Sequence, residues 1–208
     1  MIDPSTLITY VAVVLGFVFI PGPATLLTVA RATSSGTKAG IATGAGVAAG
    51  DIFHTVMAMV GISAIIAASA VLFSIIKYIG AAYLIYLGIR AMIEKAPANP
   101  TAGTLAISPG KAFRQAVLTE ILNPKTALFF LAFLPQFVRP ENGSVMLQLF
   151  TLGIIFVLLG LFSTVVFALS AGGLGRFLRR NPKVLKWQGK IVGGIYCSLG
   201  IRLALQHR

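Results

Sequence analysis

Length, composition and charge exclude an ordinary soluble protein. The chain has 208 residues, of which 57% are hydrophobic and only 11% are charged, whereas a soluble domain carries roughly a quarter charged residues. Such a chain could not cover its own surface with polar groups in water. The formal net charge of +12 does not predict nucleic-acid binding, because the basic residues lie between apolar runs rather than along one polar face.

Six apolar runs predict an all-α membrane protein with about six transmembrane helices. Several runs reach the roughly 20 residues that a helix needs to cross the hydrocarbon core of a bilayer. The run 149–159 does not alternate between apolar and polar residues as a β-barrel strand would, so a helix is the form that satisfies its backbone within lipid. The predicted spans are about 6–28, 39–66, 71–92, 112–138, 145–170 and 184–205.

The spans are expected to form a single transmembrane domain, 1–208, made of two units of three helices. The first unit covers about 1–93, a linker containing Pro and Gly covers 94–111, and the second unit covers about 112–208. The tetrapeptide Leu-Gly-Ile-Arg closes both the third and the sixth span, and prolines break the first and the fourth. Because three is odd, the units would form a 3+3 inverted repeat, as in secondary transporters that hold substrate at broken helices near the midplane.

Basic residues predict the orientation of the spans. The first, third and fifth connections carry most of the Lys and Arg residues, and the positive-inside rule places such connections in the cytoplasm. Both termini are therefore expected outside the cytoplasm. The basic residues in question are Arg31, Lys38, Arg90, Lys95, Lys111, Arg114, Arg176, Arg179, Arg180, Lys183 and Lys186.

The first break consists of Pro21, Gly22 and Pro23, deep inside an apolar run. Each proline removes a backbone donor and clashes with the preceding turn, and glycine relaxes the local geometry. One interpretation is a structural kink. The other is a polar pocket beside the broken ends, in which the positively polarised amino end of the second half-helix would suit a carboxylate.

The second span is rich in regularly spaced glycines. Gly36, Gly40 and Gly44, and then Gly46 and Gly50, are spaced by four residues, which predicts close helix packing rather than ligand contact.

Asp51 and His54 share one face of the same span. Because an ionised carboxylate in hydrocarbon is costly, Asp51 is expected to face the interior and to mark a substrate pathway or a proton site. The alternative is a structural carboxylate paired with a lysine or arginine. His54 would either relay protons or hydrogen-bond Asp51.

A second polar cluster surrounds the break in the fourth span, at Glu120, Asn123, Pro124 and Lys125. Pro124 frees a backbone carbonyl near Glu120, and Asn123 can satisfy exposed backbone groups. Glu120 and Lys125 could compensate each other across the break. Together with Asp51, the cluster supplies two acids and one base, which fits a zwitterionic amino acid as well as a simple structural ion pair.

No cofactor, metal or catalytic site is expected. The single cysteine, Cys197, excludes a disulfide framework or a thiolate cluster, and the two histidines, His54 and His207, lie far apart in the sequence. No Walker, GxGD or HExxH motif occurs. The chain is therefore not expected to be an enzyme, and an ion gradient rather than ATP is expected to supply the energy.

Three stretches resemble the lysine exporter and homoserine/threonine exporter (LysE/RhtB) family. They are PGPATLL at 21–27, the glycine-spaced run that ends at Gly50-Asp51, and NPKTALFFLAFLPQF at 123–137. The likeness covers essentially the whole chain, and the NPK-x-x-x-FF-x-x-x-x-PQF block is specific. The resemblance implies a protein in the lipid bilayer of the bacterial inner membrane that exports amino acids or close derivatives from the cytoplasm in exchange for protons. It also raises homodimerisation as an expectation.

Two departures from the family pattern bear on the substrate. Ala24 stands where many relatives of this family have a polar residue, and Glu120 stands where many have an uncharged polar one, so the exported amino acid is left open. Three alternatives to an amino-acid exporter also remain at this point: a passive channel, a multidrug exporter and a non-transporting membrane scaffold.

Overall fold

The computed structural model describes residues 2–20, 22–68, 70–93, 105–180 and 182–205, and within these ranges the chain is helical with short connections. Each predicted span corresponds to one helix or to one broken pair. The elements are α1 (Pro4–Phe19), α2 (Pro23–Ser35), α3 (Thr37–Ala68), α4 (Ala70–Ile93), α5 (Pro109–Ile121), α6 (Pro124–Leu128), the π-helix η1 (Phe129–Phe133), the 3₁₀-helices η2 (Leu134–Phe137) and η3 (Pro140–Asn142), α7 (Val145–Arg180) and α8 (Pro182–Leu205).

Prolines explain where several helices begin. Five of the α-helices, and the 3₁₀-helix η3, start with proline, because at the first helical position the missing backbone N–H costs no hydrogen bond. At both predicted breaks the proline therefore opens a new helix instead of kinking one. The α1–α2 pair is bent by 51°, and α5 is bent by 45° from the segment Pro124–Phe137.

The segment after the second break changes its hydrogen-bond pattern twice. It runs from α6 through a turn of π-helix into the 3₁₀-helix that contains Pro135. Pro135 has no backbone N–H to give to the carbonyl four residues earlier, so a regular α-helix could not continue through it. Short π-helical insertions of this kind often occur at functional sites.

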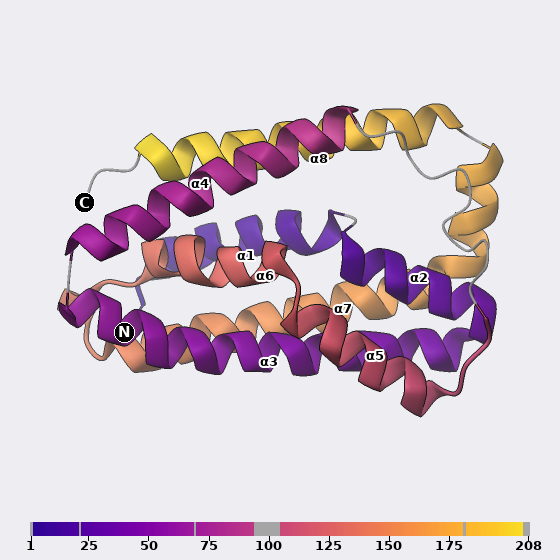
Figure 1. Cartoon of the computed structure of the whole chain (residues 1–208), viewed down its shortest axis with the longest axis horizontal. Helices are drawn as coiled ribbons and strands as arrows, with labels where there is room; N and C mark the ends of the chain where they lie inside the picture. The colour runs from indigo at the N-terminus through magenta and orange to yellow at the C-terminus, as the bar shows by residue number, and fades with distance from the viewer. Residues whose placement is uncertain (1, 21, 69, 94–104, 181, 206–208) are drawn as a thin grey trace.

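Two groups of helices lie on either side of α1 and α6 (Figure 1), and aromatic side chains fill the space between them. The helices α4 and α8 lie along one edge, whereas α3, α5 and α7 lie along the opposite edge, with α1 and α6 between them. The layer of aromatic side chains joins α1, the π-helix and α7. Its members include Phe17, Phe129 and Phe156, and the ring centroids of Phe129 are 4.4 Å from Phe17 and 4.9 Å from Phe156.

Glycines allow the closest helix contacts, as the spacing in the second span predicts. A Cβ at Gly50 would lie 2.5 Å from the Cβ of Glu120, and one at Gly40 would lie 2.5 Å from the Cβ of Ala32. Gly36 is an exception. It connects α2 to α3 with a φ of +88°, a backbone conformation that other residues rarely adopt. Glycine is therefore needed here for the turn and not for close packing.

The repeated tetrapeptide also acts through its glycine. A Cβ at Gly88 would lie 2.7 Å from the backbone oxygen of Gly193, and one at Gly200 would lie 2.8 Å from that of Ala81. The two copies of Leu-Gly-Ile-Arg therefore pack α4 and α8 against each other.

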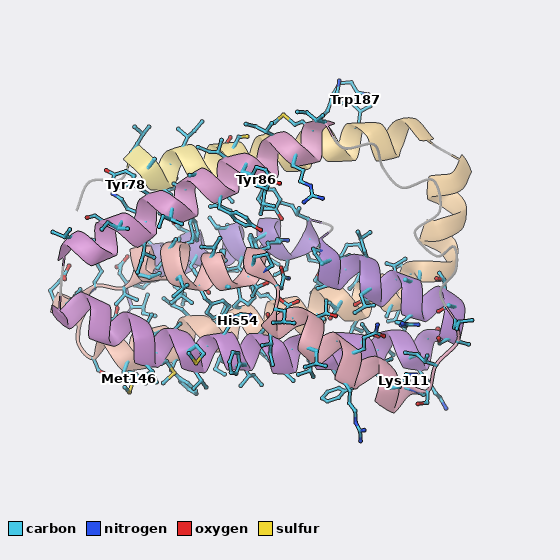
Figure 2. All side chains as sticks on the ribbon, viewed as in Figure 1. His54, Tyr78, Tyr86, Lys111, Met146 and Trp187 are labelled. Atoms are coloured by element: carbon cyan, nitrogen blue, oxygen red, sulfur yellow. The ribbon has the colours of Figure 1, made fainter. Side chains whose placement is uncertain are left out.

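The outer surface suits a lipid environment. Large hydrophobic side chains project outward, among them Tyr78, Met146 and Trp187 (Figure 2). By length and hydropathy, Thr37–Gly61 and Val145–Ala171 can each cross a membrane, and counting each bent pair as one span raises the number to four among the described residues. The chain is thus an all-α, multi-pass membrane protein. The total of six crossings stays a prediction.

Candidate functional site

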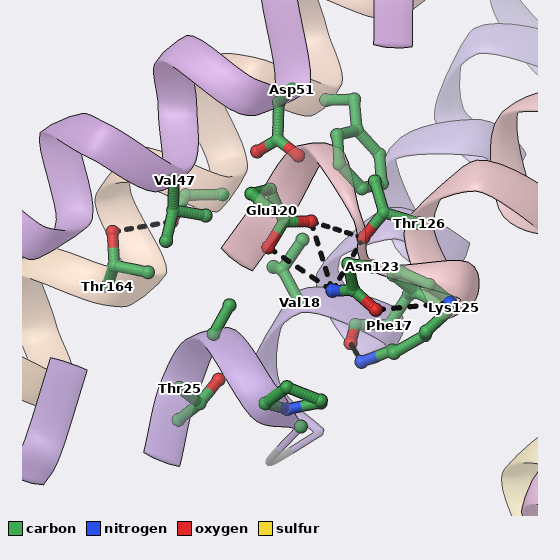
Figure 3. Close-up of a pocket in the computed structure, with 15 residues that line it drawn as sticks. Phe17, Val18, Thr25, Val47, Asp51, Glu120, Asn123, Lys125, Thr126 and Thr164 are labelled. Carbon is green, nitrogen blue, oxygen red and sulfur yellow. Dashed lines mark hydrogen bonds between the residues drawn. The ribbon is translucent and has the colours of Figure 1, made fainter. Parts of the chain in front are cut away.

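The two helix breaks meet at a small cavity inside the protein (Figure 3). Its volume is about 40 Å³, whereas one water molecule needs about 10–15 Å³ measured in the same way. Polar residues from both halves of the chain face this space together with apolar ones. The lining residues are Phe17, Val18, Gly22, Pro23, Ala24, Thr25, Val47, Asp51, Glu120, Asn123, Lys125, Thr126, Phe156, Gly160 and Thr164.

The amino end of α2 forms one wall of the cavity. The first backbone N–H groups of a helix have no acceptor within the helix. At α2 the N-cap residue is Gly22, which has no side chain to accept from them. The Thr25 side chain is buried and lines the same wall. Pro21, which the sequence places in this break, lies outside the described residues.

The carboxyl end of α1 is satisfied by side chains from the second half of the chain. The ammonium group of Lys125 lies 3.4 Å from the backbone oxygens of both Phe17 and Ile20. The hydroxyl of Ser163, on α7, donates to the backbone oxygen of Val18 at 2.9 Å. The predicted compensation between Glu120 and Lys125 is therefore not a direct ion pair, because the lysine points to the end of α1 instead.

The carboxylate of Glu120 is hydrogen-bonded by residues just across the break between α5 and α6. Its carboxylate is 1% exposed and accepts two hydrogen bonds from the Asn123 amide, at 3.1 and 3.2 Å, and one from the Thr126 hydroxyl. The Asn123 side-chain oxygen accepts from the backbone N–H of Lys125 at 3.1 Å and so caps α6. The prediction that Asn123 satisfies an exposed backbone group is confirmed.

His54 binds the backbone rather than Asp51. Its Nε2 lies 2.9 Å from the backbone oxygen of Glu120, and Nε2 must carry the proton to donate to a carbonyl. This is the carbonyl that Pro124 cannot bond, because proline lacks an N–H four residues later. The ring also stacks on Phe130 with centroids 5.9 Å apart, and it lies in the interior (Figure 2). Of the two alternatives for His54, a hydrogen bond to Asp51 is therefore not the one that the structure forms.

Asp51 faces the cavity from α3 (Figure 3). It is 2% exposed, and it lines the cavity together with Glu120 and Lys125. Across the cavity, a Cβ at Gly160 would lie 3.2 Å from an Asp51 oxygen. No lysine or arginine in the described part of the chain forms an ion pair with Asp51, so the structural-pair alternative has no support in its contacts.

Comparison with known proteins agrees with this architecture. Residues 15–207 match the LysE type translocator family. The chain belongs to this family. The predicted resemblance is therefore confirmed, and it covers almost the whole translocator.

Several full-length relatives of this translocator are known. The chain is 36% identical over 211 residues to the uncharacterized membrane protein YrhP of Bacillus subtilis, covering 96% of this chain and 99% of the relative. An uncharacterized membrane protein of Vibrio cholerae is 32% identical over 202 residues, with 97% and 98% covered. The leucine efflux protein of Salmonella typhimurium is 27% identical over 197 residues, with 94% and 93% covered. No solved structure matches the chain.

Most of the predicted site residues of the translocator come together. Gly22, Pro23, Asp51, Glu120, Asn123 and Lys125 line the cavity, whereas His54 and Pro124 lie just behind it and shape the backbone around Glu120. The wall supplied by α7 was not predicted. Phe156, Gly160 and Thr164 recur every four residues and so share one helix face, and the threonine in this apolar run was the available signal.

Proposed function

We propose that this translocator exports amino acids from the cytoplasm across the bacterial plasma (inner) membrane in exchange for protons. The observation that carries the proposal is Asp51, a buried carboxyl group facing the cavity between two broken helices in a LysE type translocator. Acids buried at such positions in transporters commonly mark proton or substrate pathways. The leucine efflux relatives support amino acids as the substrate class.

The cavity favours amino acids with an uncharged, apolar side chain. Phe17, Val47 and Phe156 contribute apolar wall, while the acids and the amino end of α2 lie on the remaining sides. An α-ammonium group can face Asp51, and an α-carboxylate can face the free N–H groups that begin α2. This arrangement leaves the apolar wall for the side chain.

The small volume of the cavity favours alternating access over an open pore. A volume of about 40 Å³ is far below the roughly 300–1,000 Å³ of typical small-molecule pockets. The helices must therefore separate before an amino acid can bind. The breaks at α1–α2 and α5–α6 supply the bends at which such a movement can occur.

Asp51 is the proposed proton carrier, because the oxygens of Glu120 already accept three hydrogen bonds. Protonation would release a bound ammonium group, and loss of the proton would restore the charge that attracts it. In this hypothesis inward proton flow is coupled to outward movement of the amino acid.

The test is uptake of a panel of labelled amino acids into proteoliposomes with an acidic interior. In these vesicles protons leave as the amino acid enters, so exchange is measured as uptake. The wild-type protein is expected to accumulate one or a few apolar amino acids only while the proton gradient lasts. Asp51→Asn should abolish the accumulation, and Asp3→Asn, which changes an acid at the start of α1, should not. Leakage that ignores the gradient would contradict exchange and favour a channel, and accumulation of drugs instead of amino acids would favour a multidrug exporter.

A further inference from the structure

The carboxyl end of α1 is capped in an unusual way. The helix ends at Phe19, and the next residue, Ile20, is extended, so the last helical carbonyls have no backbone donor along the helix. Inside a membrane such groups need partners from elsewhere in the protein. Lys125 and Ser163 provide them from α6 and α7, as described above.

Lys125 occupies a site built for a cation. Its ammonium group lies at the negatively polarised end of α1, where a positive charge is favourable, and 4.2 Å from the centroid of the Phe17 ring and 5.4 Å from that of Tyr196. Ring faces attract cations at such distances. The side chain also packs on the first break, since a Cβ at Gly22 would lie 3.2 Å from Nζ.

The same lysine is connected to the acids of the cavity. Its backbone N–H donates to the side-chain oxygen of Asn123, whose amide donates to Glu120. These hydrogen bonds join Lys125 to Glu120, which lines the cavity together with Asp51 (Figure 3). The Nζ–oxygen separations of 3.4 Å exceed the about 2.7–2.9 Å of strong charge-assisted bonds, so the ammonium group can leave without breaking a short bond.

We propose that Lys125 is a positioning residue that joins the two helix breaks, holding α1 and α2 closed over the cavity until its ammonium group leaves the end of α1. It acts on the helix end and not on the substrate. Its importance for transport rests on the proposed export function, but the contact itself can be tested without any substrate.

The experiment measures how readily a cysteine in the cavity wall is labelled. The reporter is Ala24→Cys, in a protein whose native Cys197 is replaced by serine, reconstituted in lipid and treated with a small maleimide. Lys125→Met should speed the labelling by about 5- to 30-fold, the factor that corresponds to losing a cation from a partly buried helix end. Lys111→Met, on an exposed lysine of α5, should leave the rate unchanged.

Two further variants separate loss of the contact from misfolding. Lys125→Arg keeps the positive charge and should label at a rate close to that of the reporter alone. Lys125→Ala should label quickly, and added ethylammonium, which can fill the vacated cation site, should slow it again. Such a response requires a folded site.

The proposal is overturned if Lys125→Met labels within twofold of the reporter alone, or if ethylammonium has no effect on Lys125→Ala. Neither result would bear on whether the protein exports amino acids. If Lys125 instead bound the substrate, amino acids and not ethylammonium would slow the labelling of the cysteine in Lys125→Ala. This outcome would also overturn the proposal.

Discussion

At the scale of single residues, burial alone does not distinguish the polar groups of the site, but their partners do. His54 bonds the backbone oxygen of Glu120, and the side-chain oxygen of Asn123 accepts from the backbone N–H of Lys125, so both residues satisfy backbone groups at the second break. Glu120 is bound within its own break. Asp51 instead turns toward the cavity. One acid is therefore positioned for exchange with the cavity, and the neighbouring residues keep the broken backbone satisfied.

The hydrogen bond from His54 to the backbone of Glu120 is expected to stabilise the fold. The imidazole gives the backbone oxygen of Glu120 a second hydrogen bond, beside the one from the backbone N–H of Asn123 at 3.0 Å, and such a bond contributes about 0.5–1.5 kcal/mol. His54→Phe should therefore lower the unfolding temperature of the purified protein, whereas His54→Gln, which keeps an N–H donor, should lower it less.

Transport separates this structural role from a proton relay. His54→Gln cannot carry a proton, but it is expected to retain uptake that depends on the proton gradient. If His54→Gln were as stable as the wild type and had lost gradient-driven uptake, the relay interpretation would replace the structural one.

At the scale of helices, close packing depends on a few glycines. Gly200 and Gly194 lie in the same helix, but only the first is close to a neighbour: a Cβ there would lie 2.8 Å from the backbone oxygen of Ala81, whereas one at Gly194 would meet nothing within 4 Å. The α4–α8 contact therefore provides a matched comparison.

Gly200→Ala should destabilise the protein by roughly 1–3 kcal/mol, as overpacking of a tight interface does. Gly194→Ala should be neutral or stabilising, because alanine favours a helix by about 1 kcal/mol over glycine. Thermal unfolding of both variants in the same detergent measures the difference. Equal effects of the two substitutions would mean that α4 and α8 are not in close contact.

Sequence patterns predicted these helices better than they predicted their side-chain contacts. Apolar length located the spans, and Pro23 and Pro124 located both breaks, because proline acts through the local backbone. The π-helix at Phe129–Phe133 leaves no comparable local signal. The direction of Lys125 was also unpredictable, since it depends on carbonyls of Phe17 and Ile20 more than 100 positions away.

At the scale of the whole molecule, each break is completed by the other half of the chain. Ser163 on α7 bonds the end of α1, and His54 on α3 bonds the end of α5. This reciprocal arrangement is what an inverted repeat would produce, since the second helix of each unit serves the broken helix of the other. The inverted repeat, like the placement of both termini outside the cytoplasm, stays a prediction.

Such an arrangement makes the two breaks interdependent. A change of charge at Asp51 can therefore reach the first break through Glu120, Asn123 and Lys125. In the proposed exchange, a proton leaves the vesicle through Asp51 whenever an amino acid enters it.

The most direct test follows the internal pH of proteoliposomes with a trapped dye while an amino acid accepted by the wild-type protein is added outside, with no pH gradient imposed. If Asp51 couples the two movements, the interior should become more alkaline as the amino acid enters and protons leave, and Asp51→Asn should show no such change. Entry of the amino acid without any pH change, or an equal pH change in folded Asp51→Asn, would rule out coupling through Asp51.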